Sequence, residues 1–150
     1  MKVRVVVVGK LSRWSKEALG HYEKLLRRFL KLEILRLPTA GDLNKVDHAL
    51  LKKKEGEEIR RKIRGVSLCL DKRGKMLNSK EFSELIRQLL GKEVSFIIGG
   101  PLGLSEGVLK SCDRIISFSQ MTYSHEVAFV VLLEQLFRAF KILRGERYDY

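Results

Sequence analysis

Apolar residues along this chain occur in two patterns, short continuous runs and longer stretches in which they recur at helical spacing. The continuous runs are rich in β-branched residues and end at glycine, proline or charged residues, which is typical of buried strands. They predict five strands, at residues 2–8, 32–37, 66–70, 94–98 and 114–118. In the stretches between them, apolar residues fall on one face of a helix and charged residues separate them. This spacing predicts helices at residues 14–29, 45–64, 78–90, 105–112 and 126–143.

The order of these expected elements indicates the fold. Strand and helix alternate along the whole chain, without an internal repeat or a linker. Such alternation favours an α/β fold with a mostly parallel sheet, right-handed crossovers and helices on both faces. We therefore expect one domain spanning residues 1–150. Loops are expected at residues 39–44 and 119–124 and a charged turn at residues 71–75, and the first of these loops is a candidate for substrate contact or for disorder.

The last expected helix differs from the others. In residues 126–143 the apolar side chains cover more than one side, and a helix of this kind is either buried or packed against another chain. The excess of apolar surface predicts a homodimer. The helix at residues 45–64 is the opposite case, because it has a thin apolar seam and many Lys and Arg residues. These basic side chains face either RNA or solvent.

The net charge adds a class of partner to this picture. The 150-residue chain has 30 Lys and Arg residues against 18 Asp and Glu residues, which gives a formal charge of +12. A field this positive attracts polyanions and speeds their encounter. Nucleic acid is therefore the expected partner, and a solvated basic surface, such as that of a heat-stable protein, is the alternative. No apolar run approaches the roughly 18 residues of a membrane span, so no membrane partner is expected.

The two cysteines, Cys69 and Cys112, are too few for a disulfide framework and do not have metal-ligand spacing. Cys69 lies in an expected strand, where it is interpreted as a small core hydrophobe. The sequence offers no cluster of metal ligands, so no metal is expected. The strand-like first residues lack the cleavage site of a signal peptide. Together these features predict a cytoplasmic protein.

The stretch from Val94 to Ser105 is the first indication of a ligand site. An apolar run ends in Gly99-Gly100-Pro101-Leu102-Gly103, and Ser105 then suits the N-cap of a helix. Glycines at a strand exit let the backbone approach a ligand closely, and open α/β sheets bind their ligands at this edge. No lysine–hydroxyl pair follows the glycines, which argues against a P-loop phosphate site.

Four motifs occur in order along the chain: LDKRGK at residues 70–75, IIGGPLGL at 97–104, SFSQMTYSH at 117–125 and EQLFRAF at 134–140. Together they resemble the ribosomal large subunit methyltransferase H family, of the SPOUT class, and the resemblance covers essentially the whole chain. It implies a SPOUT-type fold with a C-terminal trefoil knot, and a homodimer. It also implies transfer of a methyl group from S-adenosylmethionine to N3 of a pseudouridine in helix 69 of 23S ribosomal RNA, so the ribosome is the implied partner.

By matched position, the resemblance implies that the loops of the knot bind S-adenosylmethionine. The residues carried over are Leu70, Gly99, Phe118, Ser119, Gln120, Met121, Thr122 and Tyr123. Three expected strand exits lead to the same edge of the sheet, which agrees with this assignment. Leu102, Leu104 and Met121 either pack against the adenine or are simple core residues.

The resemblance also suggests catalytic residues. Because the N3–H of pseudouridine is weakly acidic, a positive field or a base would favour its anion. His125 is the candidate for a polar contact and Arg138 for stabilising the anion, while Tyr148 belongs to the matched C-terminal ending. The residues leave two alternatives open, namely that His125 caps the last helix and that Arg138 pairs with Glu134 at i, i+4.

Two positions depart from the family pattern. The family commonly ends in Tyr-His, and this chain has Tyr148-Asp149; many members carry an arginine where this chain has Phe129. Either Asp149 substitutes as proton acceptor or deprotonation is left to solvent. Two other functions therefore stay open: a SPOUT methyltransferase with another RNA target, and a non-catalytic RNA- or ribosome-binding module.

Overall fold

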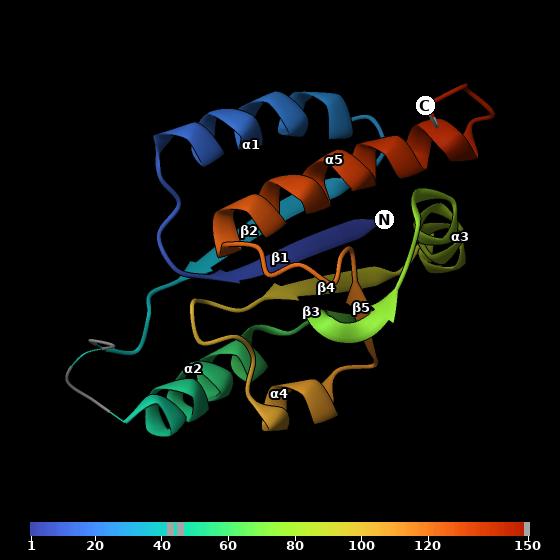
Figure 1. Ribbon diagram of the computed structural model, residues 1–150. Helices are drawn as coiled ribbons and strands as arrows, with labels where there is room; N and C mark the ends of the chain where they lie inside the picture. Colours follow the sequence, from blue (N-terminus) through green and yellow to red (C-terminus); the bar gives the residue numbers. More distant parts are fainter. Residues whose placement is uncertain (42–43, 45–46, 149–150) are drawn as a thin grey trace.

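The computed structural model describes residues 1–41, 44 and 47–148. In this part of the chain, five strands form one sheet in the order β2-β1-β4-β3-β5, and every neighbouring pair is parallel (Figure 1). The strands are β1 (Lys2–Val8), β2 (Lys31–Leu37), β3 (Val66–Met76), β4 (Glu93–Ile98) and β5 (Arg114–Ser117). The helices are α1 (Arg13–Leu26), α2 (His48–Lys62), α3 (Ser79–Leu89), α4 (Glu106–Ser111) and α5 (His125–Leu143).

The α/β fold, the parallel sheet and the helices on both faces are confirmed. Helices α1, α3 and α5 lie on one face of the sheet, and α2 and α4 lie on the other (Figure 1). Successive side chains of a strand point to opposite faces. Accordingly, Val5 and Val7 of β1 belong to the core beneath α5, while Val6 and Val8 belong to the core that packs on α4.

The helices begin close to their expected positions. Asn78 caps α3 and Ser105 caps α4, as the sequence predicts. Helix α2 begins at His48. Residues 45–46 of that expected helix and residues 42–43 of the loop before it lie outside the described residues, so those parts of the expectation stay predictions.

The expected charged turn at residues 71–75 is wrong, because β3 continues through it. Leu70 and Lys75 both pair with Ile116 of β5. Residues 71–74 are therefore an outward bulge within one long strand. The strand resumes because β5 offers it a partner, and a run of charged residues gives no sign of such a partner.

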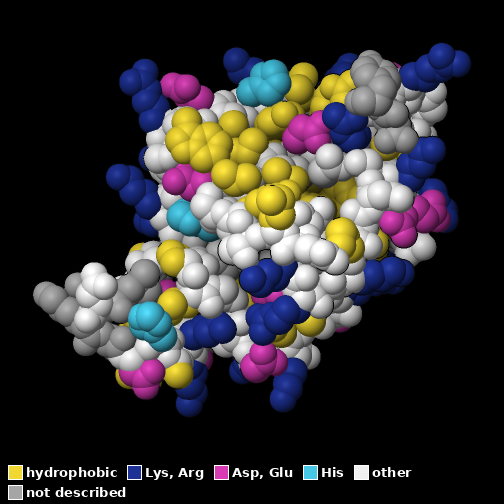
Figure 2. Space-filling model, viewed as in Figure 1, with side chains coloured by type: hydrophobic (Ala, Val, Ile, Leu, Met, Phe, Trp, Pro, Cys, Tyr) yellow, Lys and Arg dark blue, Asp and Glu magenta, His cyan; other side chains and the backbone are white. Residues whose placement is uncertain are grey.

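The long apolar helix α5 lies beside α1 and α3 and buries most of its apolar side chains within this chain (Figure 1). Its apolar character on several sides is therefore largely explained by packing inside one protomer. Among the exposed apolar side chains, Trp14 (49%) lies in the first turn of α1, and Tyr123 (39%) and Val127 (39%) lie around the start of α5, where Glu126 bonds to Ser12. We call these three residues the apolar patch. Figure 2 shows hydrophobic side chains gathered over α1 and the start of α5.

Although α5 is long and apolar, neither it nor any other helix of the described residues has the length and hydropathy to cross a membrane.

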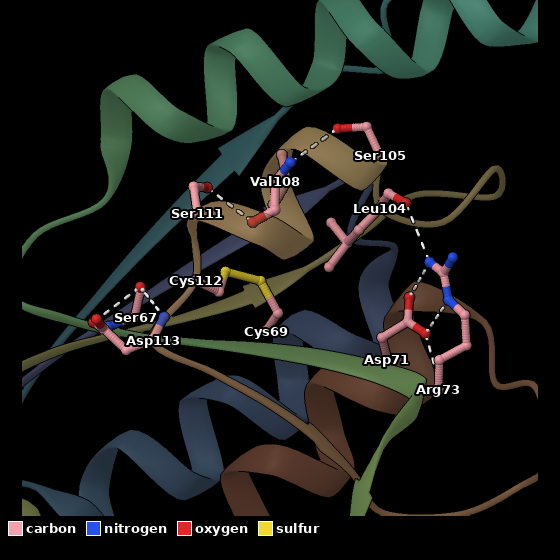
Figure 3. Close-up of a disulfide and its surroundings, with 10 residues drawn as sticks. All are labelled: Ser67, Cys69, Asp71, Arg73, Leu104, Ser105, Val108, Ser111, Cys112 and Asp113. Atoms are coloured by element: carbon pink, nitrogen blue, oxygen red, sulfur yellow. Dashed lines mark hydrogen bonds and ion pairs between the residues drawn. A yellow bond between two sulfur atoms is a disulfide. The ribbon is translucent and has the colours of Figure 1, made fainter.

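The two cysteines form a disulfide, which the sequence does not predict, and Cys69 is fully buried in the core, as interpreted (Figure 3). Cys69 lies in β3, and Cys112 ends α4, with their Cα atoms 6.2 Å apart. Beside the disulfide, the Asp113 carboxylate accepts the Ser67 backbone N–H at 2.8 Å, and the Ser67 hydroxyl accepts the Asp113 N–H at 3.0 Å. A separation of 43 residues carries no motif. Only the packing of α4 against β3 brings the thiols together.

Candidate functional site

The bulge of β3 after Leu70 and the carboxyl ends of β4 and β5 meet at one edge of the sheet and border a cavity of about 540 Å³. Parallel α/β sheets bind their ligands at this edge. The bulge at residues 71–73, the glycine loop at residues 99–104 and the loop at residues 118–124 form most of its wall. Lys52 of α2 and Ala128 of α5 also line it. The cavity is thus built by loops from three strands that are separated in sequence.

The cavity brings together most residues that the family resemblance assigns to the cofactor. Its lining includes Leu70, Gly99, Phe118, Ser119, Met121, Thr122 and Tyr123, together with the catalytic candidate His125. Gln120 is exposed and does not line the cavity. Leu104 lines it and is also buried in the core, so the two interpretations of this residue are compatible. Met121 is 73% exposed and is not a core residue.

The glycine loop is tight because its glycines permit close backbone contacts. The Gly103 N–H donates to the Gly100 carbonyl at 2.9 Å, and the φ of Gly103 is +77°, a conformation that favours glycine. A Cβ on Gly99 would lie 2.9 Å from the carbonyl carbon of Gly103. The loop therefore presents backbone N–H and C=O groups to the cavity with few side chains in the way. Such groups suit the polar edge of a flat heterocycle.

The 118–124 loop keeps its shape through short-range hydrogen bonds of serines. The Ser117 hydroxyl donates to the Ser119 carbonyl at 2.7 Å, and the Ser119 hydroxyl accepts the Met121 N–H at 3.0 Å. Ser124 then caps α5, because its hydroxyl accepts a backbone N–H of the first turn at 3.2 Å. The alternative that His125 caps this helix is therefore wrong.

His125 is held against the end of β1. Its Nε2 lies 2.6 Å from the Lys10 carbonyl oxygen, which can only accept, so Nε2 carries the proton. Gly9 has a φ of +115°, and a Cβ there would lie 2.7 Å from Nε2 of His125. In the neutral ring, Nδ1 remains an acceptor. The sequence marks Gly9 as the end of the first strand and as part of the family's start at residues 7–10, but not as the residue that leaves space for a side chain lining the cavity.

Glu126 joins the first turn of α5 to the start of α1. Its Oε2 accepts the Ser12 N–H at 2.8 Å, the Ser12 hydroxyl at 2.5 Å and the Ser15 hydroxyl at 2.6 Å. These bonds stabilise the charged form and lower the pKa of Glu126 to about 2. Sequence reasoning missed this residue, and its only signal is an acidic side chain in the first turn of a helix.

The charged groups on the β3 bulge are engaged with their surroundings. The Asp71 carboxylate accepts Nε–H and Nη2–H of Arg73 at 2.8 and 2.9 Å (Figure 3). These hydrogen bonds hold the pKa of Asp71 below its ordinary value. The Lys72 ammonium donates to the Thr122 hydroxyl at 2.9 Å. Charged side chains therefore connect the loops around the cavity.

Arg138 and Tyr148 lie at the other end of α5. The Arg138 guanidinium donates to Oε1 of Glu134 through Nη2 at 2.6 Å and through Nε at 3.0 Å, so the i, i+4 pairing is confirmed. It also donates to the Tyr148 carbonyl and lies 5.1 Å above the Tyr148 ring. Arg138 follows His125 by 13 residues, a rise of about 20 Å along a helix. One protomer does not bring the three predicted catalytic residues together.

The two departures from the family pattern have different outcomes. Phe129 is fully buried, so in this chain the position where many family members carry an arginine contributes to the core. Asp149 lies outside the described residues, and its role as a substitute proton acceptor stays a prediction. Within the described residues, no group of three or more His, Cys, Asp and Glu side chains is placed to hold a metal ion.

Comparison with known proteins gives consistent matches over the full length. The sequence model of a family described as predicted SPOUT methyltransferase matches residues 1–149. Two proteins named ribosomal RNA large subunit methyltransferase H are similar over 100% of both chains: the one from Thermotoga neapolitana is 42% identical and the one from Thermosipho melanesiensis is 43% identical. A solved structure of a probable methylase family protein from Haemophilus influenzae has a TM-score of 0.56 at 10% identity, over 99% of this chain and 70% of that one. The last match concerns the fold alone.

Proposed function

We propose that this chain, which belongs to the SPOUT methyltransferases and within them to the ribosomal RNA large subunit methyltransferase H family, methylates N3 of a pseudouridine in helix 69 of 23S ribosomal RNA. The methyl donor is S-adenosylmethionine. Identity above 40% over the full length of two relatives with that name supports ribosomal RNA as the substrate. The net charge of +12 suits a polyanionic partner. Residues 1–150 act as one domain, in the cytoplasm, where ribosomes are.

The observation that carries the proposal is the cavity between the bulge of β3 and the ends of β4 and β5. Its volume of about 540 Å³ lies within the range of small-molecule sites. Leu70, Gly99, Phe118, Ser119 and residues 121–123 are the proposed cofactor residues, and Gln120, which does not line the cavity, is left out. The glycine loop offers backbone groups for the adenine edge, and Leu70 and Phe118 offer apolar surface for its faces. When bound, the cofactor supplies a methyl group activated by its sulfonium charge.

The proposal includes the path of the backbone. In the family, the loops that bind the cofactor belong to a C-terminal trefoil knot, and we assign that knot to the segment from β3 to α5. The meeting of three loops from β3, β4 and β5 around one cavity supports it.

The chemistry needs the N3 lone pair of the target base, so the N3 proton must leave, either to solvent or to Asp149, as the methyl group passes from the sulfonium to N3. A positive charge beside the base favours the resulting anion, because it stabilises charge that develops in the transition state. Arg138 is the proposed source of this charge. His125 makes a polar contact at the cavity, and its Nε2–H is already committed to the Lys10 carbonyl. Tyr148 positions Arg138 through its carbonyl and ring.

Because Arg138 lies about 20 Å along α5 from His125, we propose that it serves the cavity of a second copy in a homodimer. The apolar patch of Trp14, Tyr123 and Val127 is the proposed contact surface. Tyr123 belongs both to this patch and to the cavity lining. A second copy that covers the patch therefore reaches the mouth of the cavity, and an interface between two identical copies is self-complementary.

The direct test is a calorimetric titration of the purified protein with S-adenosylmethionine, followed by mapping of the modified nucleotide on ribosomes from a deletion strain. The expected results are saturable binding and loss of the N3-methyl group from helix 69. Absence of any binding would favour a non-catalytic RNA-binding module. Binding without a change in helix 69 would move the target to another RNA base. Sedimentation that gives a 17.3 kDa species at micromolar concentration would exclude the dimer.

A further inference from the structure

Lys72 and Arg73 are neighbours on the bulge of β3, at the rim of the cavity. The bulge exists because Leu70 and Lys75 pair with the same residue of β5. The chain re-enters the strand at Gly74, where a Cβ would lie 2.6 Å from the carbonyl carbon of its neighbour in β5. The bulge therefore pushes two cationic side chains out of the sheet while both of its ends stay fixed in one strand.

Arg73 connects this bulge to the glycine loop and to α4. Its Nη1 donates to Oε1 of Glu106 at 2.9 Å, and its Nη2 donates to the Leu104 carbonyl at 3.3 Å. The same guanidinium is held by Asp71 through two parallel hydrogen bonds (Figure 3). Asp71 is only 9% exposed, so the anchor is firm. A planar guanidinium with several fixed donors suits such a bridge, which a lysine could not reproduce.

Lys72 connects the bulge to the third loop. Its Nζ donates to the hydroxyl of Thr122 at 2.9 Å. Thr122 lies in the exposed part of the 118–124 loop, beyond the hydrogen bonds that Ser117 and Ser119 make within it. Two adjacent side chains thus connect all three loops that border the cavity.

We infer that Lys72 and Arg73 are positioning residues that keep the three loops at the separation needed to bind the cofactor. Arg73 fixes the wall formed by the glycine loop, and Lys72 fixes the wall formed by the 118–124 loop. Neither residue transfers a proton or a methyl group. The inference rests on the proposed function for the identity of the ligand, S-adenosylmethionine, but the bridge itself consists of contacts within the chain.

The test compares Arg73→Gln and Lys72→Met with Arg87→Gln. Arg87 pairs with Glu84 on the exposed side of α3, away from the cavity lining, so it controls for the loss of one surface ion pair. We expect Arg73→Gln to weaken binding of S-adenosylmethionine about tenfold, since a bridge of several charge-assisted bonds is lost. We expect Lys72→Met to weaken it about threefold, since one exposed contact is lost. The melting temperature of each ligand-free variant should stay within about 2 °C of the wild type.

Two further readouts separate positioning from general destabilisation. The KM for the cofactor should rise while kcat at saturating cofactor stays near the wild-type value, and Arg73→Lys should restore only part of the affinity. Amide hydrogen exchange of residues 99–104 should be faster in Arg73→Gln and unchanged in Arg87→Gln. If Arg73→Gln binds the cofactor as tightly as Arg87→Gln does, the inference is wrong.

Failure of the proposed function would look different. If the wild-type protein does not bind S-adenosylmethionine, the proposed function fails. Amide hydrogen exchange of residues 99–104 then still tests whether Arg73 holds the glycine loop in place. Faster exchange in Arg73→Gln than in Arg87→Gln would support the positioning role for a different ligand. Equal exchange in the two variants would reject it.

Discussion

The two ends of α5 hold the predicted catalytic residues in different surroundings. At the first turn, His125 bonds to the end of β1 and Glu126 bonds to the start of α1, beside the cavity. Near the last turns, Arg138 bonds to Glu134 of its own helix and to the carbonyl of Tyr148 in the tail. The first end is fixed by the connection between β1 and α1, and His125 itself lines the cavity. The second is fixed by Glu134 and Tyr148, and among the described residues neither of these partners lines the cavity, as expected for a group that acts on another copy.

The sharpest test of this difference is Arg138→Met. We expect kcat to fall about 100-fold or more, which is the usual cost of removing one group that stabilises developing charge. The dissociation constant of S-adenosylmethionine should change less than about twofold, because Arg138 does not line the cavity of its own protomer. Steady-state kinetics and calorimetry measure the two quantities. A rise in the dissociation constant that matches the fall in kcat would contradict the separation of the two ends.

Mixing inactive variants tests whether the two ends meet between copies. Gly99→Val should block the cavity, since even a Cβ at this position lies 2.9 Å from the backbone of Gly103. Subunits with Gly99→Val and subunits with Arg138→Met should each be inactive alone. After exchange in equal amounts, about a quarter of the wild-type activity should return, because half of the dimers then carry one intact site. If activity does not return although subunit exchange is proven, each active site uses the cavity and the Arg138 of the same protomer.

The next largest effect is expected for Gly9→Ala, at the first end of α5. The φ of +115° and the His125 ring at 2.7 Å both disfavour a Cβ there, and the free energy of unfolding should fall by about 2 kcal/mol. Urea denaturation gives this value. Gly20→Ala in α1 is the matched control, since nothing lies within 4 Å of its Cβ position and alanine there should be neutral or stabilise the helix by up to about 1 kcal/mol. Equal changes in the free energy of unfolding for Gly9→Ala and Gly20→Ala would argue against a close contact between position 9 and the His125 ring.

Glu126→Gln should change how stability depends on pH. The pKa of Glu126 is lowered from 4.5 to about 2 in the folded chain, so its contribution is complete above pH 4.5 and is lost as the pH falls toward 2. We expect the variant to lose about 1 kcal/mol near neutral pH, after allowance for solvent screening. It should be no less stable than the wild type near pH 2.

Urea titrations at pH 7, 4 and 2.5 measure this effect. Glu17→Gln, on an exposed pair of α1, is the control and should leave the pH profile unchanged. An unchanged profile for Glu126→Gln as well would mean that the carboxylate does not join α5 to α1.

The smallest effect is expected for His125→Ala. Loss of one hydrogen bond at the rim of the cavity should weaken S-adenosylmethionine binding about fivefold. His125→Gln can still donate a hydrogen bond toward the Lys10 carbonyl and should recover part of the loss. Calorimetry distinguishes the two variants. A kcat effect as large as that of Arg138→Met would show that His125 takes part in the chemistry itself.

Local patterns predict the elements well because each strand and helix has its own periodicity, and the family motifs identify most of the cavity lining. They do not predict contacts that depend on the arrangement of elements. The space left by Gly9 for His125 joins residues 116 positions apart. The continuation of β3 beyond its bulge depends on β5. The separation of Arg138 from the cavity follows from the length of α5, and no motif at residues 134–140 indicates it.

The disulfide between Cys69 and Cys112 affects how this protein must be handled. Closing a loop of 43 residues stabilises a chain by about 4 kcal/mol in the entropic description, more than any substitution discussed above is expected to cost. Most cytosolic proteins keep their thiols reduced, and intracellular proteins of hyperthermophiles are an exception. The oxidised and reduced forms are two thermodynamic species. A melting temperature for this protein therefore has meaning only when the thiol reagent in the buffer is stated with it.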